Sequence, residues 1–126
     1  MKTIINSEKA PKAIGPYSVA VKANGFVYCS GQLGLDPVSG DLVAGGVEEQ
    51  ARQALENVKS VLESSGCTLA DVVKTTIFLV DMKDFPAVNG VYGSYFSADY
   101  PARSTFAVAA LPKAGLIEIE VIALAK

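Results

Sequence analysis

Charged side chains near the C-terminal end of the chain are the strongest candidates for chemistry. Arg103 is one of only two arginines and stands where a loop at 100–102 becomes an apolar strand. A guanidinium fixed at such a boundary can grip a planar carboxylate through two hydrogen bonds, although an ordinary surface or interface arginine has the same pattern. Glu118 and Glu120 alternate with isoleucines. Each carboxylate therefore has one of three states: it is exposed to water, it is paired with a cation, or its pKa is raised and it can act as an acid or base.

The residue types that the chain lacks narrow this chemistry further. There is no histidine among the 126 residues, which excludes Ser-His-Asp and Cys-His nucleophiles and histidine-ligated metal sites. Proton transfer must come from Asp, Glu, Tyr, Lys or Cys, and a glutamate is the best candidate. Cys29 and Cys67 form no CxxC pair, so we expect reduced, buried thiols and no metal.

Three other positions have a functional and an ordinary interpretation. Gly31 follows a predicted strand and permits close approach of a ligand to the backbone, and a plain turn explains it equally well. Tyr17 ends the turn-rich segment 6–17, where its phenol could donate to a ligand or pack. Asn89 lies among the apolar residues of a predicted helix and therefore needs hydrogen-bond partners.

The elements that must position these side chains follow the order β-β-β-α-β-α-β-β. An apolar stripe predicts the first helix, which ends before a capping glycine at Gly66, and Asp84 could cap the second. Asn24-Gly25 predicts a hairpin turn. This order indicates an α+β fold with one mixed sheet and both helices on one face. The predicted strands are 4–5, 18–23, 26–30 (stopping at Gly31), 71–80, 103–110 and 116–125, and the helices cover about 47–62 and 85–96.

The last strand indicates that the second face of the sheet is covered. Leu116, Ile122 and Leu124 share that face with the two glutamates, which is unusual for a water-facing surface. We therefore expect a homo-oligomer with a polar cleft between subunits. If the last two strands were hairpin partners, Arg103 would lie about 20 Å from Glu118. A shared pocket then requires another strand arrangement or a contribution from a sister chain.

Length and composition limit the remaining classes. The 126 residues, half of them hydrophobic, fit a single domain spanning residues 1–126. No apolar run approaches the ~20 residues of a membrane helix, and no apolar stretch near Met1 resembles a secretory signal, so we expect a cytoplasmic protein without a membrane partner. The net charge of −2 predicts no nucleic-acid partner, and the absence of GxGxxG and Walker-type glycine motifs argues against nucleotide binding.

Several segments together resemble the Rid family of reactive intermediate deaminases, the YjgF-like proteins. The similarity covers nearly the whole chain and is densest from residue 101 onward. Its most specific pieces are Ala10-Pro11-Lys12-Ala13-Ile14-Gly15-Pro16-Tyr17-Ser18, Ser30-Gly31-Gln32, Gln50–Val58, Val73–Phe78, Pro101-Ala102-Arg103-Ser104-Thr105, Leu111-Pro112-Lys113 and Ile117–Ala123.

The resemblance implies a chorismate-mutase-like fold and a homotrimer with ligand clefts between subunits. It also implies cofactor-free hydrolysis of enamine and imine intermediates, such as 2-aminoacrylate and 2-iminopropanoate, to a 2-keto acid and ammonia. Pyridoxal-phosphate-dependent dehydratases generate such intermediates, which makes these enzymes functional partners.

The resemblance also assigns roles to residues. Arg103 matches the arginine that binds the substrate carboxylate, Glu118 the glutamate that activates water, and Tyr17 a tyrosine lent by the neighbouring chain. Many members have cysteine where this chain has Thr105, which removes any thiol-based role. The substrate-binding candidates are Ser30, Gly31, Ser104, Thr105 and Asn89.

Two other functions stay open at this point. The same cleft could hold small 2-keto acids without turnover, as a regulatory module, because binding also needs Arg103. A ribonuclease activity, attributed to some relatives, is disfavoured by the absence of histidine, the two arginines and the acidic balance of the chain.

Overall fold

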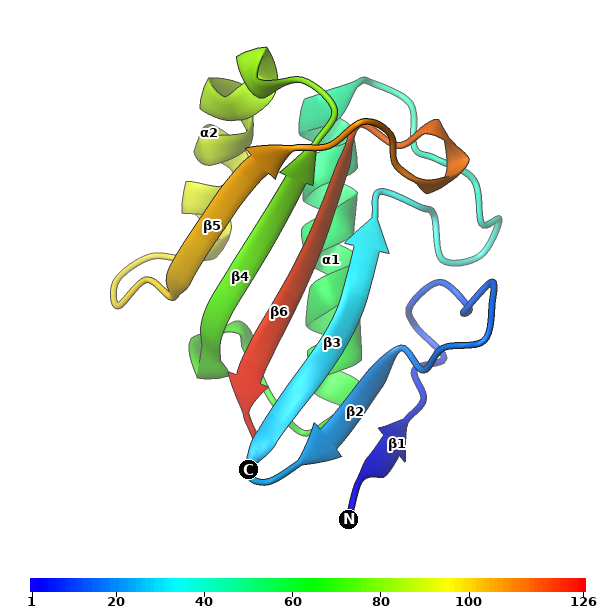
Figure 1. Ribbon diagram of the computed structural model, residues 1–126, viewed down its shortest axis with the longest axis vertical. Coiled ribbons are helices and arrows are strands. Elements are labelled where there is room, and N and C mark those ends of the chain that lie inside the picture. The colour runs from blue at the N-terminus through cyan, green and yellow to red at the C-terminus, as the bar shows by residue number, and fades with distance from the viewer.

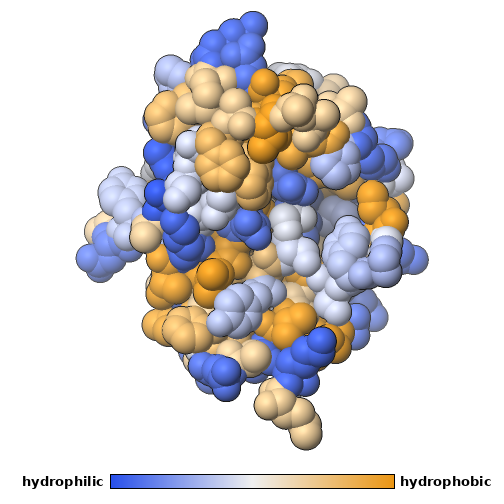
Figure 2. Space-filling model, in the orientation of Figure 1, coloured by the Kyte–Doolittle hydropathy of each residue, from blue (hydrophilic) through white to orange (hydrophobic).

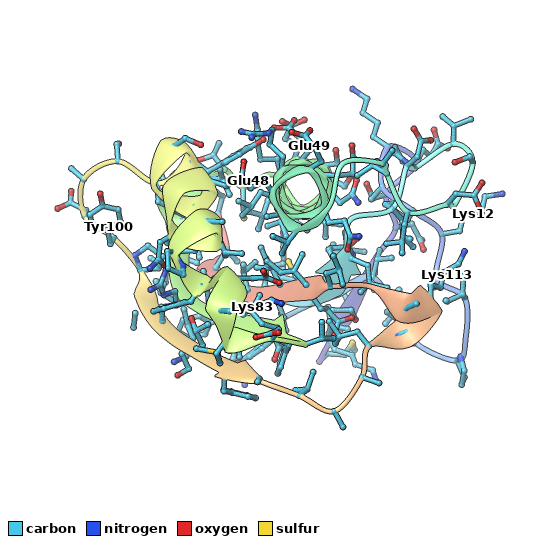
Figure 3. The ribbon with its side chains drawn as sticks, turned by 90° about the horizontal axis from the view of Figure 1, so that it is seen from above. Lys12, Glu48, Glu49, Lys83, Tyr100 and Lys113 are labelled. Carbon is cyan, nitrogen blue, oxygen red and sulfur yellow. The ribbon has the colours of Figure 1, made fainter.

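Six strands form one mixed sheet, and two α-helices lie side by side on one of its faces (Figures 1 and 3). The computed structural model describes residues 1–126. This arrangement confirms the predicted element order and fold class. Neither helix is long and apolar enough to cross a membrane. The elements are β1 (Thr3–Ile5), β2 (Ala20–Ala23), β3 (Phe26–Leu33), α1 (Val47–Ser64), β4 (Val72–Leu79), α2 (Phe85–Tyr95), β5 (Ala102–Ala107) and β6 (Ile117–Leu124), with single 3-10 turns at Leu69–Asp71, Met82–Asp84 and Pro112–Ala114.

The strand order is β1-β2-β3-β6-β4-β5, so the last strand is inserted in the middle of the sheet. β5 pairs only with β4, in parallel, and all other neighbours are antiparallel. The strands that carry Arg103 and Glu118 are therefore not hairpin partners. The predicted end of the β5 strand at residue 110 is wrong: β4 ends at Leu79, opposite Ala107, and offers no partner beyond it.

The helices dock through apolar stripes. Leu55, Val58 and Leu62 of α1 are at most 1 % exposed and pack on the sheet, as the predicted amphipathic pattern requires. α1 ends at Ser64. Gly66 follows the C-cap residue Ser65 and has φ 80°, a left-handed conformation that glycine adopts without a steric penalty. Asp84 occupies the predicted N-cap position of α2, but its side chain makes no capping hydrogen bond.

The cap near α2 belongs to the 3-10 turn before the helix. Asp81 Oδ1 accepts from the Lys83 backbone N–H at 2.9 Å, which lowers the pKa of the Asp81 carboxyl because the bond stabilises its charged form. α2 follows this turn without a break. Its first turn contains Pro86, which is favoured there because proline has no backbone N–H to leave unsatisfied.

β3 continues past the predicted stop at Gly31. Cys29 pairs with Val121 and Gln32 with Ile119, so β3 has one residue more than β6 over this stretch. That is a β-bulge at residues 30–31, which lets the strand bend and keep pairing. The bulge redirects the backbone beside Glu118, which lies next in the register opposite Leu33.

The second sheet face is uncovered in a single chain. Along β6, alternate residues such as Ile117 and Ile119 are fully buried beneath the helices. The other set of β6 residues points to the open face. Tyr28, Phe106 and Leu124 remain between 45 and 48 % exposed, and Figure 2 shows apolar side chains gathered on this side of the molecule. Such a surface is typical of a protein interface.

Cys29 and Cys67 are buried and free, as predicted. Burial raises the pKa of the Cys29 thiol to about 12, with a smaller contribution from Cys67. A thiol that stays protonated is a poor nucleophile, so these cysteines have a packing role.

Candidate functional site

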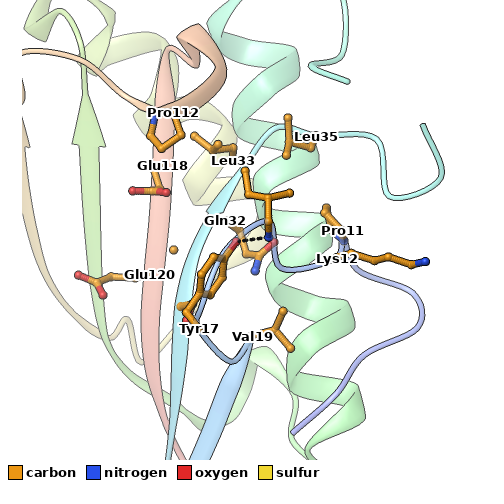
Figure 4. A pocket seen from close by; sticks show the side chains of 13 residues that line it. Pro11, Lys12, Tyr17, Val19, Gln32, Leu33, Leu35, Pro112, Glu118 and Glu120 are labelled. Carbon is orange, nitrogen blue, oxygen red and sulfur yellow. Dashed lines mark hydrogen bonds between the residues drawn. The ribbon is translucent and has the colours of Figure 1, made fainter. Parts of the chain in front are cut away.

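A cavity of about 390 Å³ opens beside the β3 bulge and the start of β6 (Figure 4). It brings together four predicted residues from three segments: Tyr17 from the N-terminal loop, Ser30 and Gly31 from the bulge, and Glu118 from β6. Apolar side chains form much of the remaining wall. The cavity therefore presents a carboxylate and hydroxyl groups in partly desolvated surroundings.

The Glu118 carboxyl is the candidate acid-base group of this cavity. Glu118 and Glu120 are two residues apart on one strand, so both project from the same face and both line the cavity. Burial, and secondarily the charge of Glu120, raise the pKa of the Glu118 carboxyl above its ordinary value. A carboxylate with a raised pKa is a better proton acceptor at neutral pH. No group of three or more His, Cys, Asp or Glu side chains is arranged to hold a metal ion.

Gly31 makes room for this carboxyl group. A Cβ at Gly31 would lie 2.7 Å from Glu118 Cδ and 2.9 Å from Cγ, closer than non-bonded carbon atoms approach. The close approach of a ligand to the Gly31 backbone stays a prediction. That the missing side chain at Gly31 makes room for the Glu118 carboxyl group was not predicted from the sequence. The β-bulge produces this proximity, and a lone glycine in a strand is the signal that indicates one.

Two hydroxyl groups are fixed around the cavity by backbone contacts. Tyr17 Oη accepts from the Ile14 N–H at 3.3 Å (dashed in Figure 4), which leaves the phenol proton free to donate. Ser30 Oγ donates to the Ser18 carbonyl at 2.6 Å, so its oxygen remains an acceptor. The Tyr17–Ile14 bond lies within the N-terminal loop, and the Ser30–Ser18 bond ties the end of this segment to the bulge.

Arg103 belongs to a second cluster on the helix-covered face at the sheet edge. It pairs in register with Thr75, which is fully buried beneath α2. Its guanidinium carbon lies 4.8 Å from the ring centroid of Tyr92 and 5.4 Å from that of Phe85. None of the salt bridges in the chain includes Arg103. This guanidinium is a partly buried cation without a counter-ion.

Two predicted binding residues share the Arg103 cluster. Thr105 follows by two positions on β5 and therefore points to the same face, and Asn89 lies between Phe85 and Tyr92 along α2. Thr105 Oγ1 and Asn89 Oδ1 are both buried without a hydrogen-bond partner. Buried polar atoms without partners are rare, so these two atoms leave hydrogen-bonding capacity unused beside Arg103.

Ser104 is separated from the Arg103 cluster. Its side chain points to the open face, where Lys74 Nζ donates to Ser104 Oγ at 2.8 Å. The alternation of side chains along β5 accounts for this placement, because neighbours in a strand face opposite sides.

The two clusters lie on opposite faces of the sheet. Arg103 is level with Thr75 of β4, whereas Glu118 is level with Phe78, three residues further along. Three residues span roughly 10 Å, and the two strand spacings between β5 and β6 add about 9.6 Å sideways. Within one chain, a small molecule on Arg103 therefore does not reach Glu118. β5 and β6 are not hairpin partners, but Arg103 and Glu118 still lie in separate parts of the chain's surface.

The chain has relatives of known name over nearly its full length. A protein-family model described as endoribonuclease L-PSP matches residues 7–125. A goat protein named 2-iminobutanoate/2-iminopropanoate deaminase is 54 % identical over 123 residues, covering 98 % of this chain and 90 % of its own.

Solved structures of similar proteins share the fold. RidA from the Antarctic bacterium Psychrobacter sp. superimposes with a TM-score of 0.94 at 47 % identity, covering 97 % of this chain and 98 % of its own. Escherichia coli TdcF with bound serine gives 0.93 at 42 % identity, covering 98 % and 99 %. With sequence, family model and fold in agreement, this chain is a member of the Rid family, the proteins covered by the endoribonuclease L-PSP model.

Proposed function

We propose that this chain is a hydrolytic deaminase that converts 2-imino acids and their enamine tautomers, such as 2-iminopropanoate and 2-aminoacrylate, into a 2-keto acid and ammonia. The observation that carries the proposal is the Arg103 cluster: a cation without a counter-ion beside two unpartnered buried polar atoms. A small anion with a carboxylate and an adjacent nitrogen matches these groups. The named activity of the goat relative supports the same reaction.

The residues suggest a division of labour for the reaction. Arg103 binds the substrate carboxylate through two hydrogen bonds, and Asn89 Oδ1 accepts from the substrate N–H. Glu118 removes a proton from water as the water oxygen adds to the imine carbon, giving a tetrahedral amino alcohol. That proton passes from Glu118 to nitrogen, which completes the amino alcohol. Glu118 then transfers the hydroxyl proton to the amino nitrogen as the C=O bond forms, the C–N bond breaks and ammonia leaves. General base catalysis contributes about 10²–10⁴-fold.

This mechanism needs a second copy of the chain. Since Arg103 and Glu118 lie on opposite faces, we propose that one protomer contributes the Arg103 cluster and its neighbour the cavity with Tyr17 and Glu118. The exposed apolar side chains on the open sheet face support a homo-oligomer. A closed ring of three copies makes every such interface equivalent.

The cellular setting of the reaction follows from its substrate. Enamines of this kind arise when pyridoxal-phosphate-dependent dehydratases release their products, so we propose these enzymes as functional partners. Free, buried thiols at Cys29 and Cys67 are typical of a reducing compartment and support a cytoplasmic site of action.

A binding module without turnover is the second candidate function. The structure of E. coli TdcF holds serine, a small molecule with the α-carboxylate that Arg103 is suited to bind. The same cleft would then report 2-keto acid levels. The ribonuclease activity in the name of the family model has less support here, because the chain carries a net charge of −2 and no histidine.

The test couples a serine or threonine dehydratase to the purified protein and follows keto-acid release. Wild type should accelerate release, whereas Arg103→Ala and Glu118→Gln should not. Arg52→Ala is the matched control, because Arg52 is the only other arginine and is exposed on α1 with Glu49 as its partner. Wild-type protein that binds 2-oxobutanoate but leaves the release rate unchanged would support the binding module instead.

A further inference from the structure

We propose that Phe85 and Tyr92 are positioning residues that hold the Arg103 guanidinium in the orientation that binds carboxylate, and that the Thr75 hydroxyl fixes the Tyr92 ring. The activity readout of this inference rests on the proposed deaminase function. Neither ring belongs to the residues expected to contact substrate. Their common feature is the spacing of seven residues along α2, two helical turns on one face.

The geometry places the cation between two aromatic rings. Seven residues of α-helix rise about 10.5 Å, which fits a guanidinium lying between Phe85 and Tyr92 at 5.4 and 4.8 Å from their centroids. Both distances are inside the ~6 Å over which a ring attracts a cation. Asn89 lies four residues after Phe85 and three before Tyr92, on the same helix face, and its carbonyl oxygen is buried without a hydrogen-bond partner.

Aromatic rings solve a conflict that a carboxylate partner would create. A partly buried cation needs a compensating interaction, but an aspartate or glutamate would occupy the in-plane N–H donors of Arg103 that must bind substrate. The face of an aromatic ring attracts the cation and leaves these donors free. The absence of any ion pair at Arg103 agrees with this arrangement.

The Tyr92 ring is itself held in place from the sheet. Thr75 Oγ1 and Tyr92 Oη are 2.9 Å apart, and both side chains are buried. Thr75 is also the β4 residue paired with Arg103. Burial raises the pKa of the Tyr92 phenol, so the ring stays neutral and keeps this hydrogen bond. Thr75 thus lies next to Arg103 in the sheet and also holds the Tyr92 ring that contacts the guanidinium.

A direct test uses the NMR signals of the arginine side chains in the full-length protein. Only Arg52 and Arg103 contribute such signals, and Arg52→Lys assigns them. Arg103 side-chain protons should be shifted upfield by the ring currents, and Phe85→Leu, which removes the ring but keeps a large apolar side chain, should reduce that shift. Phe85→Tyr should restore it. Arg103 signals at the position of Arg52 in the wild type would overturn the proposed contact.

The functional arm measures binding of 2-oxobutanoate by calorimetry and turnover in the dehydratase-coupled assay. Phe85→Leu should raise the Kd and KM about 3- to 30-fold with kcat little changed, and Thr75→Val should act in the same direction but more weakly. Phe85→Tyr should behave like wild type. In an Arg103→Ala background, Phe85→Leu should have no further effect on binding, because the ring acts through the arginine.

The two arms separate this inference from the deaminase function. If the ring-current shift is present but the wild-type protein neither turns over imines nor binds keto acids, the deaminase proposal fails and the ring contact stands. If turnover is confirmed but Phe85→Leu keeps the wild-type KM and Kd, the positioning role is wrong. Weaker binding by Phe85→Leu in the Arg103→Ala background would show direct ring–ligand contact and also contradict it.

Discussion

Gly31→Ala is predicted to displace the carboxyl group of Glu118 without touching the Arg103 cluster. The new Cβ would lie 2.7 Å from Glu118 Cδ, whereas ordinary contacts begin at 3.4 Å. The carboxyl group must therefore move by about 0.7 Å, and a misplacement of about 1 Å costs on the order of 10²-fold in rate. We expect kcat to fall about 10- to 100-fold while KM changes by less than about twofold, since carboxylate binding is separate.

The assay is the dehydratase-coupled release of keto acid, with thermal melting to show that the variant is folded. Gly93→Ala is the control. A Cβ at Gly93 would meet nothing within 4 Å, and the substitution removes a glycine from the interior of α2. It should keep the wild-type kcat and gain roughly 0.5–1 kcal/mol of stability. A folded Gly31→Ala protein with wild-type kcat, or one in which only KM rises, would refute the reasoning.

Three further variants test other features of the structure. Thr105→Val removes a buried hydroxyl without a partner, so the free energy of unfolding should increase by about 1 kcal/mol and the Tm should rise. The same variant should have a higher KM. A lower Tm would contradict this prediction. Asn57→Leu removes the amide that donates to the Leu33 and Leu35 carbonyls at 3.1 and 2.9 Å, and urea unfolding should show a loss of about 2–4 kcal/mol. Glu118→Gln tests the raised pKa of Glu118, which burial causes. The contribution of Glu118 to the free energy of unfolding should fall as pH rises from below about 4 through the folded pKa, and comparison with the variant isolates this contribution from that of the other carboxyl groups. Melts at both pH extremes should show a Tm advantage for Glu118→Gln near neutral pH that disappears in acid, and a constant difference would be inconsistent with that shift.

The local elements were predictable because their signals are local. Asn24-Gly25 forms the expected hairpin turn with φ 50° and 81°, and the apolar stripe places α1. The order of elements and the single covered face follow from the same periodicities. The apolar residues on the second face were also expected, since alternation along the last strand predicts them, whereas the covering of this face by sister subunits stays a prediction.

The division of the site could not be predicted, because it depends on long-range pairing. Insertion of β6 between β3 and β4 sets the register of Glu118, and no local pattern in 117–124 specifies those neighbours. The face on which Arg103 lies follows from its pairing with Thr75. The bulge beside Gly31 depends on one extra residue in β3 relative to β6. Each of these features depends on how distant segments pair, and the local periodicity of the sequence carries no information about that pairing.

The claim on which the account depends is that Arg103 and Glu118 act together only across two copies of the chain. Arg103→Ala and Glu118→Gln proteins, each inactive, should be denatured together, refolded and assayed for imine hydrolysis. In randomly mixed rings about one interface in four joins an intact Arg103 to an intact Glu118, so activity should return to about a quarter of wild type. Mixed oligomers as inactive as either parent would contradict a cleft built from two protomers.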